Sequence, residues 1–261
     1  MFSLNDCLTD STKILILKKK ESKLFKSKIG KIYRKHFNPA EFVGEELSDM
    51  KNIPTARYTL IGETIGFTPE HYDRVGEINK RMFDFKIGSY DFKKDDCDYI
   101  SVGEKYFNNE HALDALLELC PTESNKDKLM DELEELYALD TYMGQTDRKS
   151  QNIIFSINKK TKEIHLAPIF DYEYSLNPSY LDSDIVYENA FLRFDSIESY
   201  QDYLRKHPAL RDKLKFYLDV DLCDTVRRSY GSRCMIIPRN MYSFYKEFDE
   251  DRKELIKKII R

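Results

Sequence analysis

The sequence lacks the features that mark a membrane or exported protein. Its 261 residues contain no run near the ~18 consecutive apolar residues of a membrane span, and the N-terminus shows no basic segment followed by an apolar one. The cysteines form neither a C-x-x-C pair nor a disulfide framework; they are Cys7, Cys97, Cys120, Cys223 and Cys234. We therefore expect a cytoplasmic protein in a reducing compartment.

The sequence also lacks a large excess of charge of one sign, and it lacks histidines at the spacing of metal ligands. Lys and Arg total 42 and Asp and Glu total 46, so the net charge of −4 offers no basic field for nucleic acid or an anionic membrane. The five histidines show no H-x-x-x-H spacing, and we do not expect zinc chemistry. No internal repeat and no Gly/Ser/Pro linker divides the chain, which predicts halves that pack together. With 41% hydrophobic residues, the chain can bury a sizeable core.

The first ninety or so residues show a mixed α/β pattern. Two stretches rich in β-formers, Thr12–Lys19 and Lys31–Phe37, predict a pair of antiparallel strands that open the chain. A helix is predicted over 39–51, and further strands over 55–62 and 82–87. This half of the chain therefore carries both strands and a helix.

The remainder of the sequence is mostly helical in pattern. A helix is predicted to begin at a Ser124 cap, to place Leu129, Leu133 and Leu136 on one face, and to stop at Gly144. A short hairpin follows, formed by NIIFSI and EIHLAPIF around the turn NKKTK, and beyond Tyr180 the pattern is again helical. The sequence predicts an α+β fold in which one hairpin interrupts a helical half.

Oxygen-bearing side chains converge on one end of this predicted hairpin. Asp147 and Asn152 lie in the loop that enters the first strand, and the second strand delivers Asp171. Carboxylate and amide oxygens are the ligands that Mg²⁺ prefers, with substrate phosphates completing its shell. A further aspartate near an attacking hydroxyl can orient it or accept its proton, which is the division of labour in phosphoryl transfer. Taken alone, Asp147 could instead cap the turn after Gly144.

The motifs D-R-K-x-x-N and L-A-P-I-F-D-x-x-x-S resemble the signature of HipA-like serine/threonine kinases. That family usually reads N-x-D-R-H-x-x-N and then a-P-x-x-D-x-x-x-S. The resemblance implies that Asp147 is the catalytic aspartate, that Asn152 and Asp171 bind magnesium, and that Ser175 is the serine of the second motif. This chain differs in having Gln145 for the family's Asn, in having Lys149 for its His, and in lacking a glycine after Asp171.

The resemblance also implies a strand lysine on the nucleotide phosphates and a helix glutamate that holds it. Glu41 lies six residues before Leu47 in AEFVGEEL, which matches the family's helix spacing, and Lys35 is the corresponding lysine. Strict strand alternation would place His36 there instead. Glu41 could equally serve as a capping-box residue at the helix start, which would leave Glu45 as the lysine's partner.

The sequence contains no G-x-G-x-x-G signature that would mark a phosphate-binding loop. LTDSTK and ESKLFKSKIGK are both candidates for this loop. The implied architecture is a two-lobed protein-kinase-like α+β fold. A small α/β nucleotide-binding lobe would cover residues 1–95, and a mostly helical lobe carrying the catalytic loop and metal-binding segment would cover 96–261.

The expected activity is transfer of the γ-phosphoryl group of ATP, with Mg²⁺, to a serine or threonine hydroxyl of a protein. The family resemblance also implies an antitoxin or regulatory protein as a partner, and neither nucleic acid nor a membrane is expected to bind directly. Two alternatives stay open. One is a phosphoinositide-type or small-molecule kinase; the other is a pseudokinase, a nucleotide-binding interaction module from a toxin-antitoxin pair.

Overall fold

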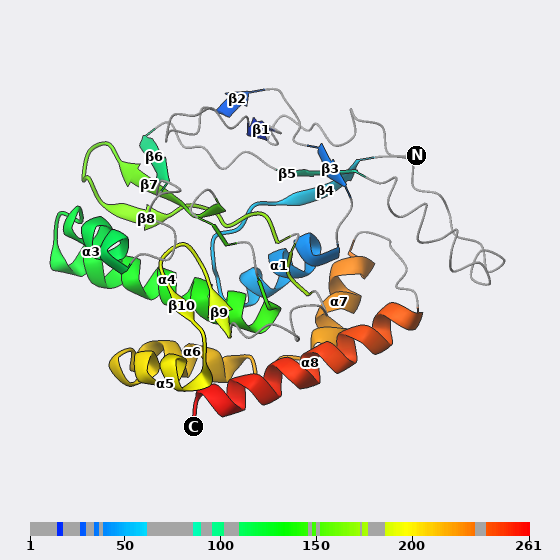
Figure 1. Ribbon diagram of the computed structural model, residues 1–261. Coiled ribbons are helices and arrows are strands. Elements are labelled where there is room, and N and C mark those ends of the chain that lie inside the picture. The colour runs from blue at the N-terminus through cyan, green and yellow to red at the C-terminus, as the bar shows by residue number, and fades with distance from the viewer. Residues whose placement is uncertain are drawn as a thin grey trace.

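The fold is mixed α/β, with small antiparallel sheets and mostly helical content. The computed structural model describes residues 15–17, 27–29, 34–36, 39–61, 86–89, 96–101, 110–145, 148–149, 152–172, 174–176, 186–232 and 239–261. In Figure 1 the strands lie toward the top and left, and the long helices cross the middle and the bottom of the molecule.

The strands form several small antiparallel sheets. In the first part of the chain, β1 (Leu15–Leu17) pairs with β2 (Ser27–Ile29), and β5 (Lys86–Ser89) lies between β3 (Arg34–His36) and β4 (Tyr58–Ile61). A second three-stranded sheet places β7 (Ile154–Asn158) between β6 (Cys97–Ser101) and β8 (Ile164–Leu166). A short ribbon joins β9 (Tyr187–Glu188) to β10 (Arg193–Phe194).

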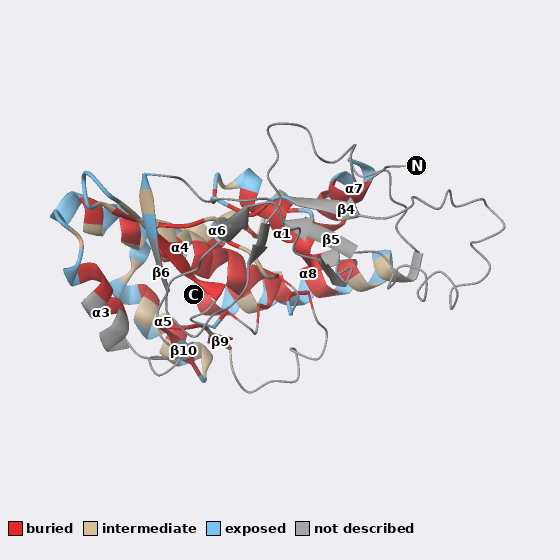
Figure 2. Cartoon of the chain, turned by 90° about the horizontal axis from the view of Figure 1, so that it is seen from above, coloured by how far each residue is buried: buried red, intermediate tan, exposed pale blue. Residues whose placement is uncertain are grey.

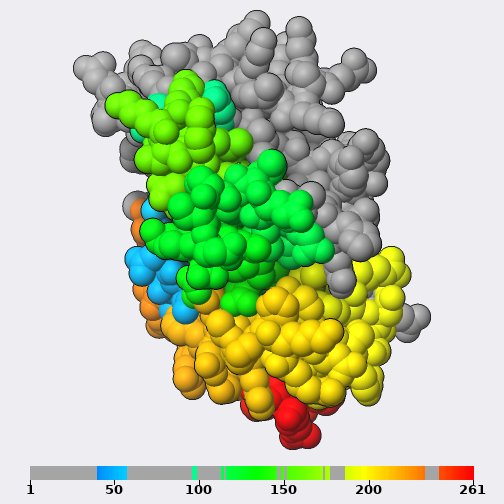
Figure 3. Space-filling model, turned by 90° about the vertical axis from the view of Figure 1, so that its left-hand side faces the viewer, coloured from blue at the N-terminus to red at the C-terminus, as the bar shows by residue number. Residues whose placement is uncertain are grey.

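The helices pack around one long central helix. Their bounds are α1 (Pro39–Met50), α3 (Glu110–Glu118), α4 (Glu123–Met143), α5 (Ile197–Lys206), α6 (Pro208–Phe216), α7 (Leu222–Gly231) and α8 (Arg239–Ile259). Seen from the side, α3 and α4 lie between the β7–β8 hairpin above and α5 and α6 below (Figure 3). No helix in the described ranges is both long and apolar enough to cross a membrane.

The core is built on α4, whose second half is buried on every side. Every residue from Leu136 to Met143 is buried, as expected for a helix that other elements surround completely. Helices α1, α6 and α8 and strand β8 contact it directly. The buried residues accordingly run along α4 and continue into α1 and α8 (Figure 2).

Helix α1 joins the first part of the chain to this helical body. It contacts α4 and α7, and its last turn leads into a short extended segment. Within that segment the backbone of Ala56 donates to the Ile169 carbonyl at 2.7 Å, and Ile169 donates to the Pro54 carbonyl at 2.7 Å. Residues near 55 are thereby tied to the chain just before Asp171.

Several predicted elements are confirmed. The helix predicted over 39–51 is α1, and the predicted stop at Gly144 is confirmed by its left-handed φ of 60°. The predicted hairpin is β7 and β8. The predicted start of α4 at Ser124 is wrong by two residues, because Thr122 adopts the extended cap conformation and accepts from the Asn125 backbone.

The predicted pairing of the first two strands is also wrong. β1 pairs with the unpredicted β2, and the strand within Lys31–Phe37 is β3, which pairs with β5. The nearer partner closes a shorter loop at lower entropic cost, so β1 takes β2. The predicted lobe boundary near residue 95 lies outside the described residues.

Candidate active site

The β7–β8 hairpin brings Asn152 and Asp171 to the same end of one element. In its register Phe155 faces Leu166, and the Ala167 backbone donates to the Ile154 carbonyl at 2.8 Å, which extends the pairing toward that end. Asn152 precedes the first strand by two residues, and Asp171 follows the second by five. The predicted convergence of these two residues on one end of the hairpin therefore follows from the strand register.

Asn152 is held in a fixed local conformation. Its side chain is buried, and its backbone N–H donates to the Lys149 carbonyl at 2.8 Å. Lys149 itself is exposed. The predicted catalytic Asp147 lies outside the described residues, and for Lys35 the structure gives the backbone position, opposite Ile87 in the β3–β5 pairing.

Asp171 has an unusual backbone conformation. Its φ of 66° is in the left-handed region, which costs a residue other than glycine about 1–3 kcal/mol and persists where the surroundings enforce it. Asp171 is only half-buried, whereas the following residue, Tyr172, is fully buried. The chain therefore bends sharply at the predicted metal ligand.

Three side chains, from two places in the sequence, bind the backbone around this bend. Arg148 Nη1 donates to the Phe170 carbonyl at 2.6 Å, and Gln145 Nε2 donates to the Asp171 carbonyl at 2.9 Å. The Tyr172 N–H donates to Glu41 Oε2 at 3.0 Å. We call Glu41, Gln145 and Arg148 the Asp171 clamp.

Glu41 links α1 to the predicted metal-binding segment. It lies in the first turn of α1 and is fully buried, although it is 131 residues away from Tyr172 in the sequence. Glu45, the alternative partner for a lysine, lies within 3.3 Å of Arg57 Nη1. Of the two glutamates, Glu41 is the one that bonds to the backbone next to Asp171.

Arg148 is a contributor to the site that the sequence analysis missed. Its guanidinium pairs with Asp140 at the end of α4, with Nε to Oδ2 at 3.0 Å and Nη2 to Oδ1 at 2.9 Å, and both side chains are fully buried. Burial alone would lower the pKa of Arg148, but the charge and hydrogen bonds of Asp140 outweigh it and raise that pKa, so the guanidinium stays charged. The signal in the sequence was an aspartate near the end of a predicted apolar helix.

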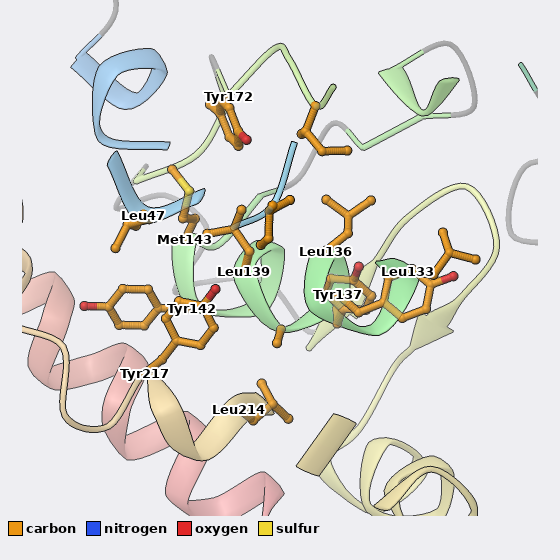
Figure 4. Close-up of a cluster of buried hydrophobic side chains, with 14 of the residues drawn as sticks. Leu47, Leu133, Leu136, Tyr137, Leu139, Tyr142, Met143, Tyr172, Leu214 and Tyr217 are labelled. Carbon is orange, nitrogen blue, oxygen red and sulfur yellow. The ribbon is translucent and has the colours of Figure 1, made fainter. Parts of the chain in front are cut away.

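Tyr172 packs the same segment against α1. Its ring lies so close to Gly44 that a Cβ on Gly44 would stand 2.5 Å from the ring. Its hydroxyl lies 2.9 Å from Ser48 Oγ and 3.2 Å from Thr55 Oγ1. Burial raises the pKa of Tyr172 to about 12, so the hydroxyl keeps its proton for these bonds. In Figure 4, Tyr172 lies on the α1 side of the core cluster, near Leu47 and Met143.

The segment after Asp171 turns back onto α4. The Ser175 N–H donates to the Tyr172 carbonyl and the Leu176 N–H donates to the Met143 carbonyl, both at 2.8 Å. Ser175 Oγ is buried without a hydrogen-bond partner among the described residues. The serine that matches the second motif is therefore part of the buried turn.

The donor groups at the hairpin end fit a hard divalent cation. A carboxylate on a half-buried turn and a buried amide offer oxygen ligands, which Mg²⁺ favours over nitrogen or sulfur. Their supports come from α1, from α4 and from the loop between α4 and β7. The segment around Asp171 is thereby held where three parts of the fold meet.

Comparison with known proteins identifies the fold. No family model and no curated protein matches the sequence. The crystal structure of the proinflammatory kinase CtkA from Helicobacter pylori matches with a TM-score of 0.58 at 14% identity, over 87% of this chain and 88% of that chain. The HipA toxin of Shewanella oneidensis, from a complex with HipB and operator DNA, matches with a TM-score of 0.57 at 10% identity, over 98% of this chain and 67% of that chain. The chain therefore has a HipA-like kinase fold.

Proposed function

We propose that the protein is an ATP-dependent phosphotransferase that transfers the γ-phosphoryl group of Mg-ATP to a serine or threonine hydroxyl of a protein. The observation that carries the proposal is the position of Asn152 and Asp171 at one end of the β7–β8 hairpin, with Glu41 bonded to the backbone next to Asp171. The kinase fold shared with CtkA and HipA supports it.

Each predicted residue has a distinct task in this proposal. Asp171 and Asn152 would hold Mg²⁺, which neutralises charge on the nucleotide phosphates when it is bound. Lys35 and Glu41 would fix the nucleotide from the first lobe. Asp147 would orient the acceptor hydroxyl and take its proton as the new bond to phosphorus forms and the bond to ADP breaks.

The proposal places the nucleotide between the first lobe, residues 1–95, and the helical lobe, residues 96–261. Closure of two lobes on a substrate excludes water and aligns the reacting groups. The contacts of α1 with α4 and α7, and the pairing of residues near 55 with Ile169, provide direct mechanical links between these parts.

An antitoxin-type protein is the partner that the comparisons support. The HipA neighbour was solved together with HipB and operator DNA. We propose that a protein of this class binds the present chain and controls its activity. Co-purification of such a protein, with loss of phosphoryl transfer in the complex, is the expected result.

The test of the proposed function separates nucleotide binding from transfer. The purified protein is incubated with Mg²⁺ and ATP labelled at the γ-phosphate, and the label on protein is measured for the wild type and for Asp147→Ala. Transfer should disappear in Asp147→Ala, whereas Mg-ATP should still raise its melting temperature, because the metal and lysine contacts persist.

Three outcomes would contradict the proposal. Equal transfer by Asp147→Ala would remove Asp147 from the reaction. A wild type that is stabilised by Mg-ATP but labels no protein, including partners in a lysate, would favour the nucleotide-binding interaction module. Label appearing in lipid or in small molecules would favour the corresponding alternative kinases.

A further inference from the structure

Gln145 stands where HipA-like kinases usually have asparagine, and its surroundings give it a specific task. Its side chain is fully buried, and its amide donates to the backbone carbonyl of Asp171 at 2.9 Å. Its own backbone N–H donates to the Asp140 carbonyl at 2.9 Å, which fixes Gln145 directly after the end of α4. The amide therefore reaches from a rigid helix end to the predicted metal ligand.

The bond from Gln145 falls at a strained position. Asp171 has a φ of 66°, and a backbone in that region relaxes unless its neighbours hold it. The carbonyl before it is held by Arg148 and the N–H after it by Glu41, so Gln145 supplies the central bond of the Asp171 clamp. A backbone held on both sides fixes the direction in which the Cα–Cβ bond of Asp171 leaves the chain.

Arg148, a neighbouring arm of the clamp, is itself fixed. Arg148 is locked by Asp140 through short contacts in a fully buried ion pair, and its guanidinium carbon lies 5.2 Å from the centre of the Tyr172 ring. Gln145 and Arg148 also flank the predicted catalytic Asp147 in sequence. Gln145 lies two residues before Asp147 and Arg148 one residue after it. Their side chains thus join the loop that would carry the base to the segment that would carry the metal.

We propose that Gln145 is a positioning residue, whose amide aims the Asp171 carboxylate at a divalent cation by holding the Asp171 carbonyl. The inference rests on the proposed function, because the cation is the one that the phosphotransferase would use. Residues that orient a metal ligand typically contribute about 10–100-fold to metal affinity. The departure from the family's asparagine is then a replacement that keeps an amide donor, with one additional methylene.

The test measures Mn²⁺ binding in the presence of a non-hydrolysable ATP analogue, by electron paramagnetic resonance of the free ion. Gln145→Met keeps the length of the side chain and removes the amide, and should weaken Mn²⁺ binding by about 10–100-fold. In the metal-free protein, the amide hydrogen of Tyr172 should exchange faster in the same variant than in the wild type. Gln145→Leu, which is uncharged and also lacks the amide donor, provides the same test if Gln145→Met fails to fold.

Gln201→Met is the matched control. Gln201 Nε2 donates to the Lys258 carbonyl at 2.8 Å, so the same substitution removes the same kind of bond between α5 and α8. Mn²⁺ affinity and Tyr172 exchange should stay at the wild-type level in this control. Wild-type Mn²⁺ affinity in Gln145→Met, or an equal loss in Gln201→Met, would overturn the proposal.

The two arms of the experiment distinguish this inference from the proposed function. A wild type that binds no Mn²⁺ with the analogue contradicts the proposed function itself. A wild type that binds Mn²⁺, together with a Gln145→Met variant that binds it equally well, contradicts the role of Gln145 alone. Unchanged Tyr172 exchange in Gln145→Met overturns the clamp whether or not metal binds.

Discussion

Gly44 and Tyr172 show at the scale of the residue why the predicted metal-binding segment sits firmly on α1. Glycine at this position of a helix allows an aromatic ring to approach the backbone, and the Tyr172 hydroxyl then reaches Ser48 and Thr55. The cost of a glycine inside a helix, about 0.5–1 kcal/mol relative to alanine, is offset by this packing. A single missing Cβ thus determines where the residue after Asp171 can lie.

Gly44→Ala should lower the free energy of unfolding by about 1–3 kcal/mol, because the new methyl group would overlap the buried Tyr172 ring. Gly231→Ala is the control, since a Cβ there meets nothing within 4 Å, and its helix should gain slightly or stay unchanged. Denaturant unfolding of both variants measures the difference. Equal stability of the two variants would show that the ring yields without cost.

The residues of the site were only partly predictable from the sequence. Asn152 and Asp171 could be predicted because oxygen-bearing side chains that flank the two strands of a hairpin form a local pattern. Arg148 and Gln145 were not assigned roles, because their partners, Asp140 and the backbone near Asp171, are fixed by tertiary packing. Glu41 was chosen by spacing, and its bond to Tyr172 spans a distance in sequence that no local pattern reports.

Helix α4 is the element that carries the hairpin and therefore the site. Near its N-terminus, Asn125 Nδ2 donates to the Ile164 carbonyl at 2.9 Å and its Oδ1 accepts from the Ile164 N–H at 3.0 Å, so one side chain pairs with β8 as a strand would. Further along, Glu132 accepts from the Leu166 N–H at 2.6 Å. The edge of β8 is satisfied by a helix in place of another strand.

Asn125→Leu should cost about 1–3 kcal/mol of stability, because it leaves a buried N–H and a buried carbonyl of Ile164 without partners. Asn158→Leu removes bonds to the exposed amides of Lys160 and Thr161, which water can replace, and should cost less. Hydrogen exchange of the Ile164 amide gives the local readout. Unchanged protection of that amide in Asn125→Leu would contradict the anchoring role.

Helices with a clear apolar periodicity or a capping residue could be predicted from the sequence. The pairing of strands could not, because it depends on which distant strand lies beside them. Helix α4 and its stop at Gly144 follow from apolar spacing and a left-handed glycine. The pairing of β3 with β5 joins segments about fifty residues apart, and nothing in Arg34–His36 selects that partner over β1.

At the scale of the whole molecule, buried tyrosines make the protein sensitive to alkaline pH. Burial raises the pKa of Tyr172 to about 12 and also raises the pKa values of other tyrosines, namely Tyr137, Tyr142, Tyr187, Tyr200, Tyr217, Tyr230 and Tyr245. In the unfolded chain a tyrosine has a pKa of about 10. The neutral phenols therefore stabilise the folded state relative to the unfolded state up to that pH.

The free energy of unfolding should fall as the pH rises above about 10, because the unfolded chain then releases protons that the folded protein retains. Tyrosinate absorbance should show a component that belongs to the buried set, and this component should appear together with loss of circular dichroism. A single smooth titration of all tyrosines near pH 10 in a folded protein would contradict this expectation.

The central claim is that the end of the β7–β8 hairpin holds a divalent cation and a nucleotide, and its most direct test is a crystal structure grown with Mn²⁺ and a non-hydrolysable ATP analogue. The anomalous signal of manganese should lie between the Asp171 carboxylate and the Asn152 amide, next to the phosphates. An ordered nucleotide whose manganese lies away from both side chains would contradict the claim.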